Sequence, residues 1–223
     1  MLEAYRNHLN VKDIMMLSSI RLIILTILLT ANIAFAQSSF VTLALPQNVS
    51  IEVPRNWIVA TQNTRMTMEA FADSIGVKMD ANYLGFYAES YDQRNMRVAS
   101  LNLIYLPTSP PLSQSMLRSF SQAKIADLLN GVKEQINQAI KSVGGKLLTW
   151  DKPKKVEING ITLVEFGYTI IVPTTGEGVV KMKTLHMFSG PKSFKLTVGY
   201  AENWARIYEP ITNHIINSLK QTN

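Results

Sequence analysis

The chain contains no cysteine and only three histidines among its 223 residues. Without thiolates it forms no disulfide, carries no lipidated N-terminal cysteine, and offers neither a cysteine nucleophile nor a cysteine-bound zinc. The sequence also lacks a Gly-x-Ser-x-Gly nucleophile turn and a glycine-rich phosphate loop. These absences favour a protein that is not an enzyme, has no catalytic residue and holds no cofactor.

The two histidines of the C-terminal half, His186 and His214, lie far apart in the sequence. With no cysteine, a metal site would need both of them together with a carboxylate such as Glu165. Their spacing does not indicate such a site, so we expect both histidines to be structural and no metal to bind. Glu177 and Glu202 could act as acids, but carboxylates in loops and at sheet edges are usually only solvated.

The N-terminus has the pattern of a secretory signal peptide. Arg21 precedes the apolar run over residues 22–30, and Ala34 and Ala36 stand at small-x-small positions before Gln37. The sequence therefore predicts a leader over residues 1–36, cleaved between Ala36 and Gln37. It predicts a single exported domain over residues 37–223, periplasmic or secreted.

Two alternatives remain open for this leader. It could be retained as a membrane anchor, although a spanning helix needs about 20 consecutive apolar residues and this run is shorter. Translation could also start at Met15 or Met16, because the segment before the apolar run is long for a leader.

The net charge of +6 is mildly basic, and the lysines are scattered along the chain. This balance could attract an acidic partner or only aid solubility. Arginine and aromatic residues do not interleave as in nucleic-acid-binding proteins, and the polar face of the longest expected helix does not indicate membrane contact. A group of lysines could form a basic patch or protect a strand edge from aggregation; its members are Lys152, Lys154, Lys155, Lys181 and Lys183.

Hydrophobic periodicity predicts strands and helices along the whole chain. Asn159-Gly160, flanked by alternating residues, is a strong hairpin signal. The apolar stripe from Leu117 to Val143 predicts one long helix, capped by Ser113 or Ser115 and ended by Gly144-Gly145. Strands are expected over residues 40–45, 49–53, 84–91, 97–106, 147–158, 161–172, 178–188 and 194–200, and helices over residues 64–79, about 113–143 and 203–220.

These elements predict an α+β protein, an α/β/α sandwich whose central, mainly antiparallel sheet has helices on both faces. Short connections between consecutive strands favour antiparallel neighbours. Apolar residues on both faces of the strand over residues 97–106 indicate a central strand. The side chains expected in the core are Val98, Leu101, Leu103, Leu128, Val132, Phe166, Tyr168, Leu196, Val198 and Ile211.

The chain resembles the PsbP/DcrB-like superfamily over most of residues 40–221. The residues that carry the resemblance are Val53-Pro54-Arg55-Asn56-Trp57, the Asn159-Gly160 hairpin, Lys195-Leu196-Thr197-Val198-Gly199-Tyr200, and the last helix with Trp204 and Ile215-Ile216-Asn217-Ser218-Leu219. The resemblance implies an α/β/α sandwich and a binding function. Known members include an extrinsic photosystem II subunit, envelope lipoproteins, chaperones for secreted effectors and a Ran-binding import factor.

Aromatic residues offer a candidate surface for a ligand or partner. This surface comprises Trp57, Tyr87, Tyr91, Trp150 and Trp204, although aromatic side chains more often fill the core of such a sandwich. The sequence thus favours an exported, non-enzymatic accessory protein that contacts a protein partner of the cell envelope or a small amphipathic ligand. The alternative is an envelope hydrolase whose site is dispersed along the chain.

Overall fold

A computed structural model describes residues 39–45, 48–59, 86–171 and 178–222. The chain divides into two compact units, Met1–Phe40 and Val41–Asn223. The predicted leader, with its cleavage site between Ala36 and Gln37, lies outside the described residues, as does the helix predicted over residues 64–79. The following description concerns the second unit.

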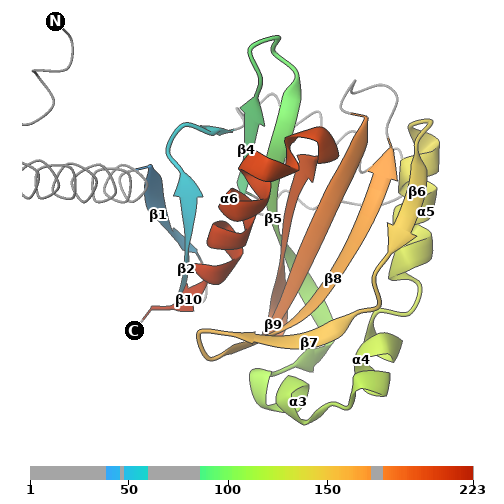
Figure 1. Cartoon of the computed structure of the whole chain (residues 1–223). Coiled ribbons are helices and arrows are strands. Elements are labelled where there is room, and N and C mark those ends of the chain that lie inside the picture. Colours follow the sequence, from blue (N-terminus) through green and yellow to red (C-terminus); the bar gives the residue numbers. More distant parts are fainter. Residues whose placement is uncertain (1–38, 46–47, 60–85, 172–177, 223) are drawn as a thin grey trace, which may run out of the picture. The chain divides into compact units, whose positions relative to one another are not determined.

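The second unit is built around a seven-stranded sheet (Figure 1). Its strand order is β3-β4-β5-β9-β8-β6, with β7 paired to β8 off this path. All of these neighbours pair in the antiparallel direction, which confirms the predicted α+β fold with a mainly antiparallel sheet. The strands are β3 (Ile58–Val59), β4 (Phe86–Tyr91), β5 (Arg97–Leu112), β6 (Lys146–Trp150), β7 (Lys154–Ile158), β8 (Ile161–Ile171) and β9 (Val179–Ala201).

The strand β5 lies inside the sheet, between β4 and β9. Leu101 and Leu103 pair with Val198 and Leu196 of β9, and all four side chains are buried. Val98 is also buried, and its side chain points to the other face because alternate residues of a strand do so. The predicted central strand is confirmed. β5 also continues past its predicted end at residue 106 to Leu112, with a shift of register after Pro107.

The strand β9 is a run of 23 residues whose two halves occupy adjacent positions in the sheet. Its first half, from Val179 to His186, pairs with β8, and its second half pairs with β5. Gly190, between the halves, has φ +67°, a left-handed conformation that glycine adopts at little cost. The hydroxyl groups of Thr184 and Thr197 lie 3.1 Å apart, so the halves lie against each other. This is the hairpin predicted around residues 189–192.

Two of the predicted elements are divided in the structure. The strand predicted over residues 147–158 is two strands, β6 and β7, with Pro153 between them. The helix predicted over residues 113–143 is three helices, α3 (Gln114–Ser119), α4 (Gln122–Leu128) and α5 (Val132–Ser142). Ser113 caps α3 as predicted, but Ser121 caps a new helix, and Gly131 has φ +88° before α5. A new cap and a left-handed residue interrupt the stripe that the periodicity reads as continuous.

The last helix, α6 (Ala205–Asn217), follows a short 3-10 turn, η2 (Glu202–Trp204). It ends earlier than predicted, because the chain then forms the strand β10 (Lys220–Gln221). β10 pairs with β2 (Val49–Pro54), and with β1 (Phe40–Leu45) they form a second sheet of order β1-β2-β10. The side-chain amide of Asn159, at the β7–β8 turn, donates to the carbonyl groups of Asn217 and Leu219 and fixes the end of α6.

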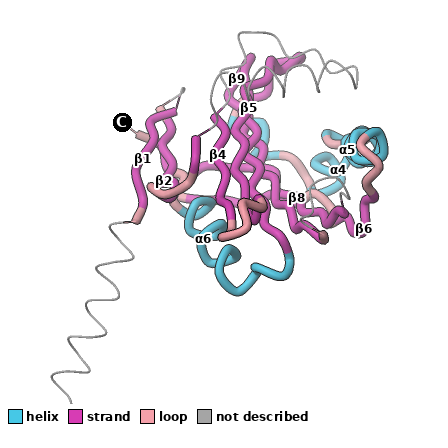
Figure 2. Tube along the Cα trace, turned by 90° about the horizontal axis from the view of Figure 1, so that it is seen from above, coloured by secondary structure: helices cyan, strands magenta, loops and turns pink. Residues whose placement is uncertain are grey.

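Helices cover both faces of the large sheet, as predicted (Figure 2). Leu117 of α3 and Ile125 of α4 form a core with Val164 and Phe166 of β8. Helix α6 packs on β9 over the other face, where the intervening residues of β8, such as Gly167, point.

Most of the side chains expected in the core are buried. Val98, Leu101, Leu103, Phe166, Leu196 and Val198 are buried. The others, Leu128, Val132, Tyr168 and Ile211, are only half-buried. The three helical residues lie at the margin of their packed faces, where periodicity alone does not separate a buried from a half-buried position.

Candidate functional site

The predicted aromatic surface is distributed over three places in the structure. Trp57 and Trp204 both contact Tyr208, with ring centroids 6.4 and 6.3 Å from the ring of Tyr208. Tyr87 and Tyr91 both donate to the carboxylate of Glu89. These two groups meet at a cavity, whereas Trp150 lies elsewhere.

This cavity, which we call the aromatic hollow, has a volume of about 500 Å³ and opens to the surface. Two elements far apart in the sequence form it, the β4–β5 turn and the segment that begins α6. Tyr91 is 37 % exposed and Trp204 is half-buried, so both rings remain accessible. The lining residues are Tyr91, Asp92, Gln93, Arg94, Trp204 and Tyr208.

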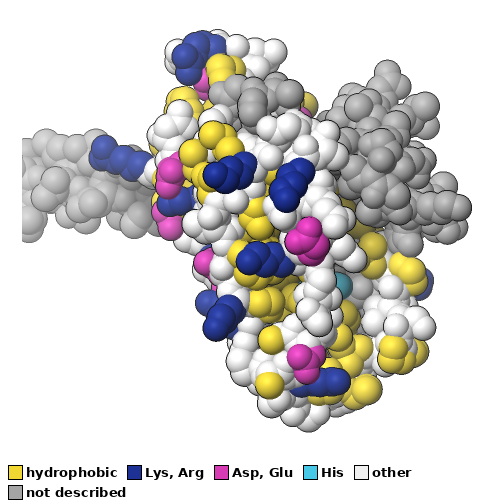
Figure 3. Space-filling view, turned by 90° about the vertical axis from the view of Figure 1, so that its right-hand side faces the viewer, with side chains coloured by type: hydrophobic (Ala, Val, Ile, Leu, Met, Phe, Trp, Pro, Cys, Tyr) yellow, Lys and Arg dark blue, Asp and Glu magenta, His cyan; other side chains and the backbone are white. Residues whose placement is uncertain are grey.

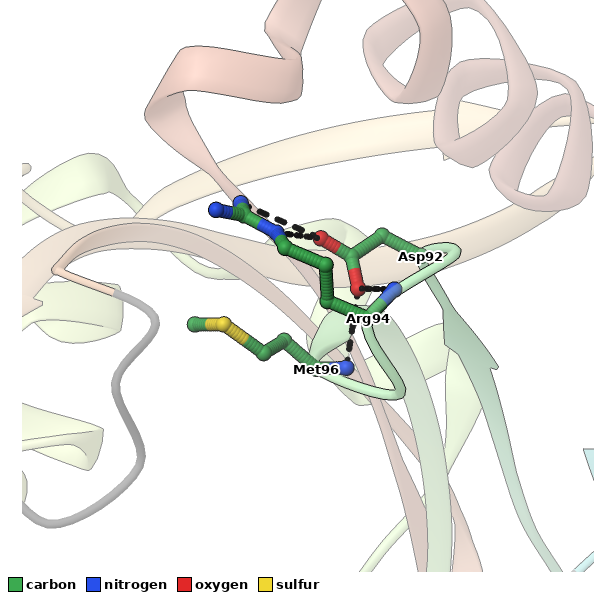
Figure 4. A network of polar contacts seen from close by, with 3 residues as sticks. All are labelled: Asp92, Arg94 and Met96. Atoms are coloured by element: carbon green, nitrogen blue, oxygen red, sulfur yellow. Dashed lines mark hydrogen bonds and ion pairs between the residues drawn. The ribbon is translucent and has the colours of Figure 1, made fainter.

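The β4–β5 turn is held by Asp92 (Figure 4). One carboxylate oxygen accepts the backbone N–H groups of Arg94 and Met96, each at 2.9 Å, and the other accepts the guanidinium of Arg94 at 3.4 Å. The hydrogen bond from the N–H of Met96, followed by those from Arg94, lowers the pKa of Asp92, although burial opposes the shift. Asn95 has φ 61°, which suits a tight turn. One wall of the hollow is therefore formed before a ligand arrives.

Glu89 orients the tyrosines beside this turn. Its carboxylate accepts from the hydroxyl groups of Tyr87 and Tyr91 and from Arg97, whose guanidinium lies 2.9 Å away. Burial would raise the pKa of Glu89, but these hydrogen bonds together hold it below its usual value. Burial raises the pKa of Tyr87, against the effect of Arg97, so its hydroxyl group stays protonated. Tyr87 thus supports the network, while Tyr91 also lines the hollow.

Trp150 belongs to the packing under the first three helices. Its ring lies 5.1 Å from that of Phe166 and 6.0 Å from that of Tyr168. Both partners lie on the face of β8 that α3 and α4 cover. The structure therefore does not bring Trp150 to the aromatic hollow.

Sequence reasoning missed Tyr208, which joins the two tryptophans. Its hydroxyl group lies 2.8 Å from that of Ser90 in β4, so it also ties α6 to the sheet. The sequence signal for Tyr208 is its distance of four residues from Trp204. Residues four apart on a helix share a face.

The two histidines lie on different elements, β9 and α6. The Nε2 of His186 is 3.0 Å from the hydroxyl of Ser193, and its ring stacks on Phe188. Burial, with a smaller effect of the nearby Lys195 charge, lowers the pKa of His186 to about 3. The Nε2 of His214 lies 2.7 Å from the carboxylate of Glu52. Within the described part of the chain no three His, Asp or Glu side chains cluster as metal ligands.

Two of the candidate carboxylates form ion pairs with candidate lysines. Lys154 pairs with Glu165 at 3.0 Å, and Lys181 pairs with Glu202 at 3.1 Å. The ammonium group of Lys155 donates to the carbonyl oxygens of Arg118 and Phe120, at the end of α3. Glu177 lies outside the described residues. Figure 3 shows the Lys and Arg side chains of one face separated by uncharged and hydrophobic ones. The described part of that face carries no continuous basic patch.

Among the described residues, no helix has the length and apolar character needed to cross a membrane.

Comparison with known proteins finds solved structures that are similar to this chain. No protein-family model and no curated protein matches the chain. A protein from Bacteroides thetaiotaomicron VPI-5482 is similar over 82 % of this chain at 10 % identity and a TM-score of 0.42, and the chain spans 48 % of that protein. Cyanobacterial PsbP from Synechocystis sp. PCC 6803 is similar over 82 % of this chain and 92 % of its own, at 11 % identity and a TM-score of 0.44.

A third similar structure is LpqN of Mycobacterium tuberculosis, described as involved in cell envelope biogenesis. It is similar over 82 % of this chain and 91 % of its own, at 12 % identity and a TM-score of 0.42. A PsbP protein is thus among the structural neighbours. The function is argued below from the residues of this chain.

Proposed function

We propose that the chain is an exported, non-enzymatic accessory protein that binds an amphipathic segment of an envelope partner in the aromatic hollow. The observation that carries the proposal is the meeting of Tyr91, Trp204 and Tyr208 around an open cavity of about 500 Å³. Rigid aromatic side chains offer a large contact area at low entropic cost, and they recur at the centres of protein interfaces.

An exposed apolar residue of α6 beside these rings supports this proposal. Ile207, between Trp204 and Tyr208 in sequence, is 51 % exposed. Exposed hydrophobic groups rimmed by polar residues mark interaction surfaces, and here Asp92 and Arg94 supply part of the rim.

Export is the other half of the proposal, and its support is the sequence of residues 1–36. The charged flank, short apolar run and Ala34-x-Ala36 site have the order that a signal peptidase reads. The partner is therefore sought among envelope proteins.

The binding proposal is tested by affinity purification of the tagged protein from envelope extract, with quantitative mass spectrometry. Trp204→Ala and Ile207→Ala are compared with Leu148→Ala, which removes a side chain that is 44 % exposed on β6, away from the hollow. A partner should lose enrichment with the first two variants and keep it with the third. Equal enrichment with all three would contradict the proposal.

A hydrolase is the second candidate, because His186 contacts Ser193 as a base contacts a nucleophile. Three observations weigh against it. Ser193 is only 1 % exposed, its hydroxyl also donates to the carbonyl of Leu106, and the charge that affects His186 is that of Lys195 rather than a carboxylate. A fluorophosphonate probe that labelled the wild type but not Ser193→Ala would favour this candidate.

A further inference from the structure

A second cavity, of about 240 Å³, lies between α6 and the sheet and shares no lining residue with the aromatic hollow. We call it the α6 groove. Residues of β6, β8 and β9 and one face of α6 line it. Ligand pockets for drug-sized molecules are about 300–1,000 Å³, so this cavity suits a smaller molecule.

The floor of the groove contains a glycine in the middle of a strand, which is an unfavourable place for glycine. The space above Gly167 is taken by a neighbouring side chain. A Cβ atom at this position would collide with the carboxylate of Asp151, whose backbone N–H also donates to the carbonyl oxygen of Gly167 at 2.9 Å. The missing side chain lets a carboxylate lie on the face of the sheet, inside the groove.

A positive charge lies beside this carboxylate. Lys183 of β9 pairs directly with Gly167 of β8, and paired residues of adjacent strands point to the same face. Lys183 and Asp151 both line the groove. Neither has an ion-pair partner among the residues that the structure describes.

Two further charged side chains line the groove, Lys181 and Glu209. Lys181 pairs with Glu202 at 3.1 Å. Glu209 lies near Tyr200, whose pKa is raised by burial and next by the charge of that carboxylate. Asp151 and Lys183 are the two opposite charges that lie together at Gly167, beside the hydrogen-bonding side chains of Thr169 and Asn213.

We propose that the α6 groove binds a small zwitterion of the free amino acid class. The ligand's ammonium group would meet Asp151 and its carboxylate would meet Lys183, while Val198 and Ile216 supply apolar contact for its side chain. A ligand that carries both charges satisfies both groups, whereas a simple anion or cation leaves one of them unpaired. The proposal does not depend on the aromatic hollow.

The test begins with the melting temperature of the purified protein in the presence of each of the twenty common L-amino acids, at about 10 mM. A ligand that binds only the folded state raises the melting temperature. At least one amino acid should do so, and its affinity is then measured by calorimetry. If none raises the melting temperature, the proposal is wrong.

The best amino acid is next compared with its N-acetyl and amide derivatives, each of which lacks one charge. Both should bind roughly tenfold or more weakly, because a hydrogen bond to a charged group is strong. Asp151→Asn should lose the preference over the N-acetyl form, and Lys183→Gln the preference over the amide. The control Lys152→Gln changes an exposed lysine that does not line the groove and should keep both preferences.

Binding that both groove variants leave unchanged would overturn the proposal, even if an amino acid binds. Trp204→Ala should not alter amino acid binding, so failure at the groove and failure at the hollow are distinguishable.

Discussion

At the scale of single residues, the packing under the first three helices depends on Phe166. Its ring is 2 % exposed and lies 5.1 Å from that of Trp150 and 6.3 Å from that of Tyr168. Leu117 and Ile125 belong to the same core. A side chain in this position stabilises the fold through its own burial and through its packing against the neighbouring rings.

Phe166→Ala should lower the free energy of unfolding by about 3–5 kcal/mol, because it removes a buried ring and leaves a cavity. The measurement is urea denaturation followed by circular dichroism. The control Leu148→Ala changes an exposed apolar residue and should stay within about 0.5 kcal/mol of the wild type. A loss below about 1 kcal/mol for Phe166→Ala would mean that the core does not depend on this ring.

His186 should make stability depend on pH. Burial, and then the Lys195 charge, lower its pKa from 6.5 to about 3 in the folded protein. Between these values the unfolded chain takes up a proton that the folded protein does not, so the free energy of unfolding falls as the pH falls from about 6.5 towards 3.

His186→Gln should therefore show a smaller loss of stability than the wild type between pH 7 and about pH 4.5. Urea titrations at both values measure it. Lys192→Gln, an exposed change on the same strand, should keep the wild-type difference. Equal losses in His186→Gln and the wild type would show that this ring does not carry the effect.

Sequence reasoning predicts single residues well where they share a strand face. Alternation places Leu101, Leu103 and Val198 in the core, and all three are buried. It does not predict that Trp57 meets Tyr208, because that contact joins residues distant in sequence. The two opposite charges of the α6 groove, Asp151 and Lys183, are not predicted for the same reason.

At the scale of elements, the helices show the limit of periodicity. One apolar stripe runs from Leu117 to Val143, yet three helices carry it. The apolar stripe predicts which side chains face the sheet. It does not show where one helix ends and the next begins in a new direction. Gly131 with φ +88° and the cap at Ser121 set those changes of direction.

The junction between α3 and α4 depends on β7. The ammonium group of Lys155 donates to the carbonyl oxygens of Arg118 at 2.6 Å and Phe120 at 2.9 Å, which the end of the helix leaves without helical partners. This contact gives a specific structural role to one of the lysines that were candidates for a basic patch or for strand-edge protection.

Lys155→Met should lower the free energy of unfolding by roughly 1 kcal/mol, because it removes these hydrogen bonds and keeps the aliphatic stem. Urea denaturation measures the change. Lys152→Met, nearby and exposed, makes neither bond and should have almost no effect. Equal effects of the two variants would contradict the assigned role.

At the scale of the whole molecule, the leader predicts the form of the protein in the cell. Cleavage between Ala36 and Gln37 should give an exported chain that begins at Gln37. N-terminal sequencing of protein from the envelope fraction checks this. Residues 1–36 still attached to protein in the membrane pellet would support the anchor instead.

The folded protein should also be independent of metal. His186 and His214 lie on different elements, and the chain has no thiolate. Treatment with EDTA should leave the melting temperature unchanged, since a metal bound only by the folded state would add stability. A drop that added zinc reverses would contradict this and strengthen the hydrolase alternative.

The position of β9 along the chain has a consequence for the timing of folding. β4 and β5 are synthesised before β9, but β5 reaches β8 and β6 only through β9, which is completed at Ala201. The large sheet therefore cannot close until β9 has been made. For the exported protein proposed above, this order would keep the sheet open while the chain passes unfolded through a translocon.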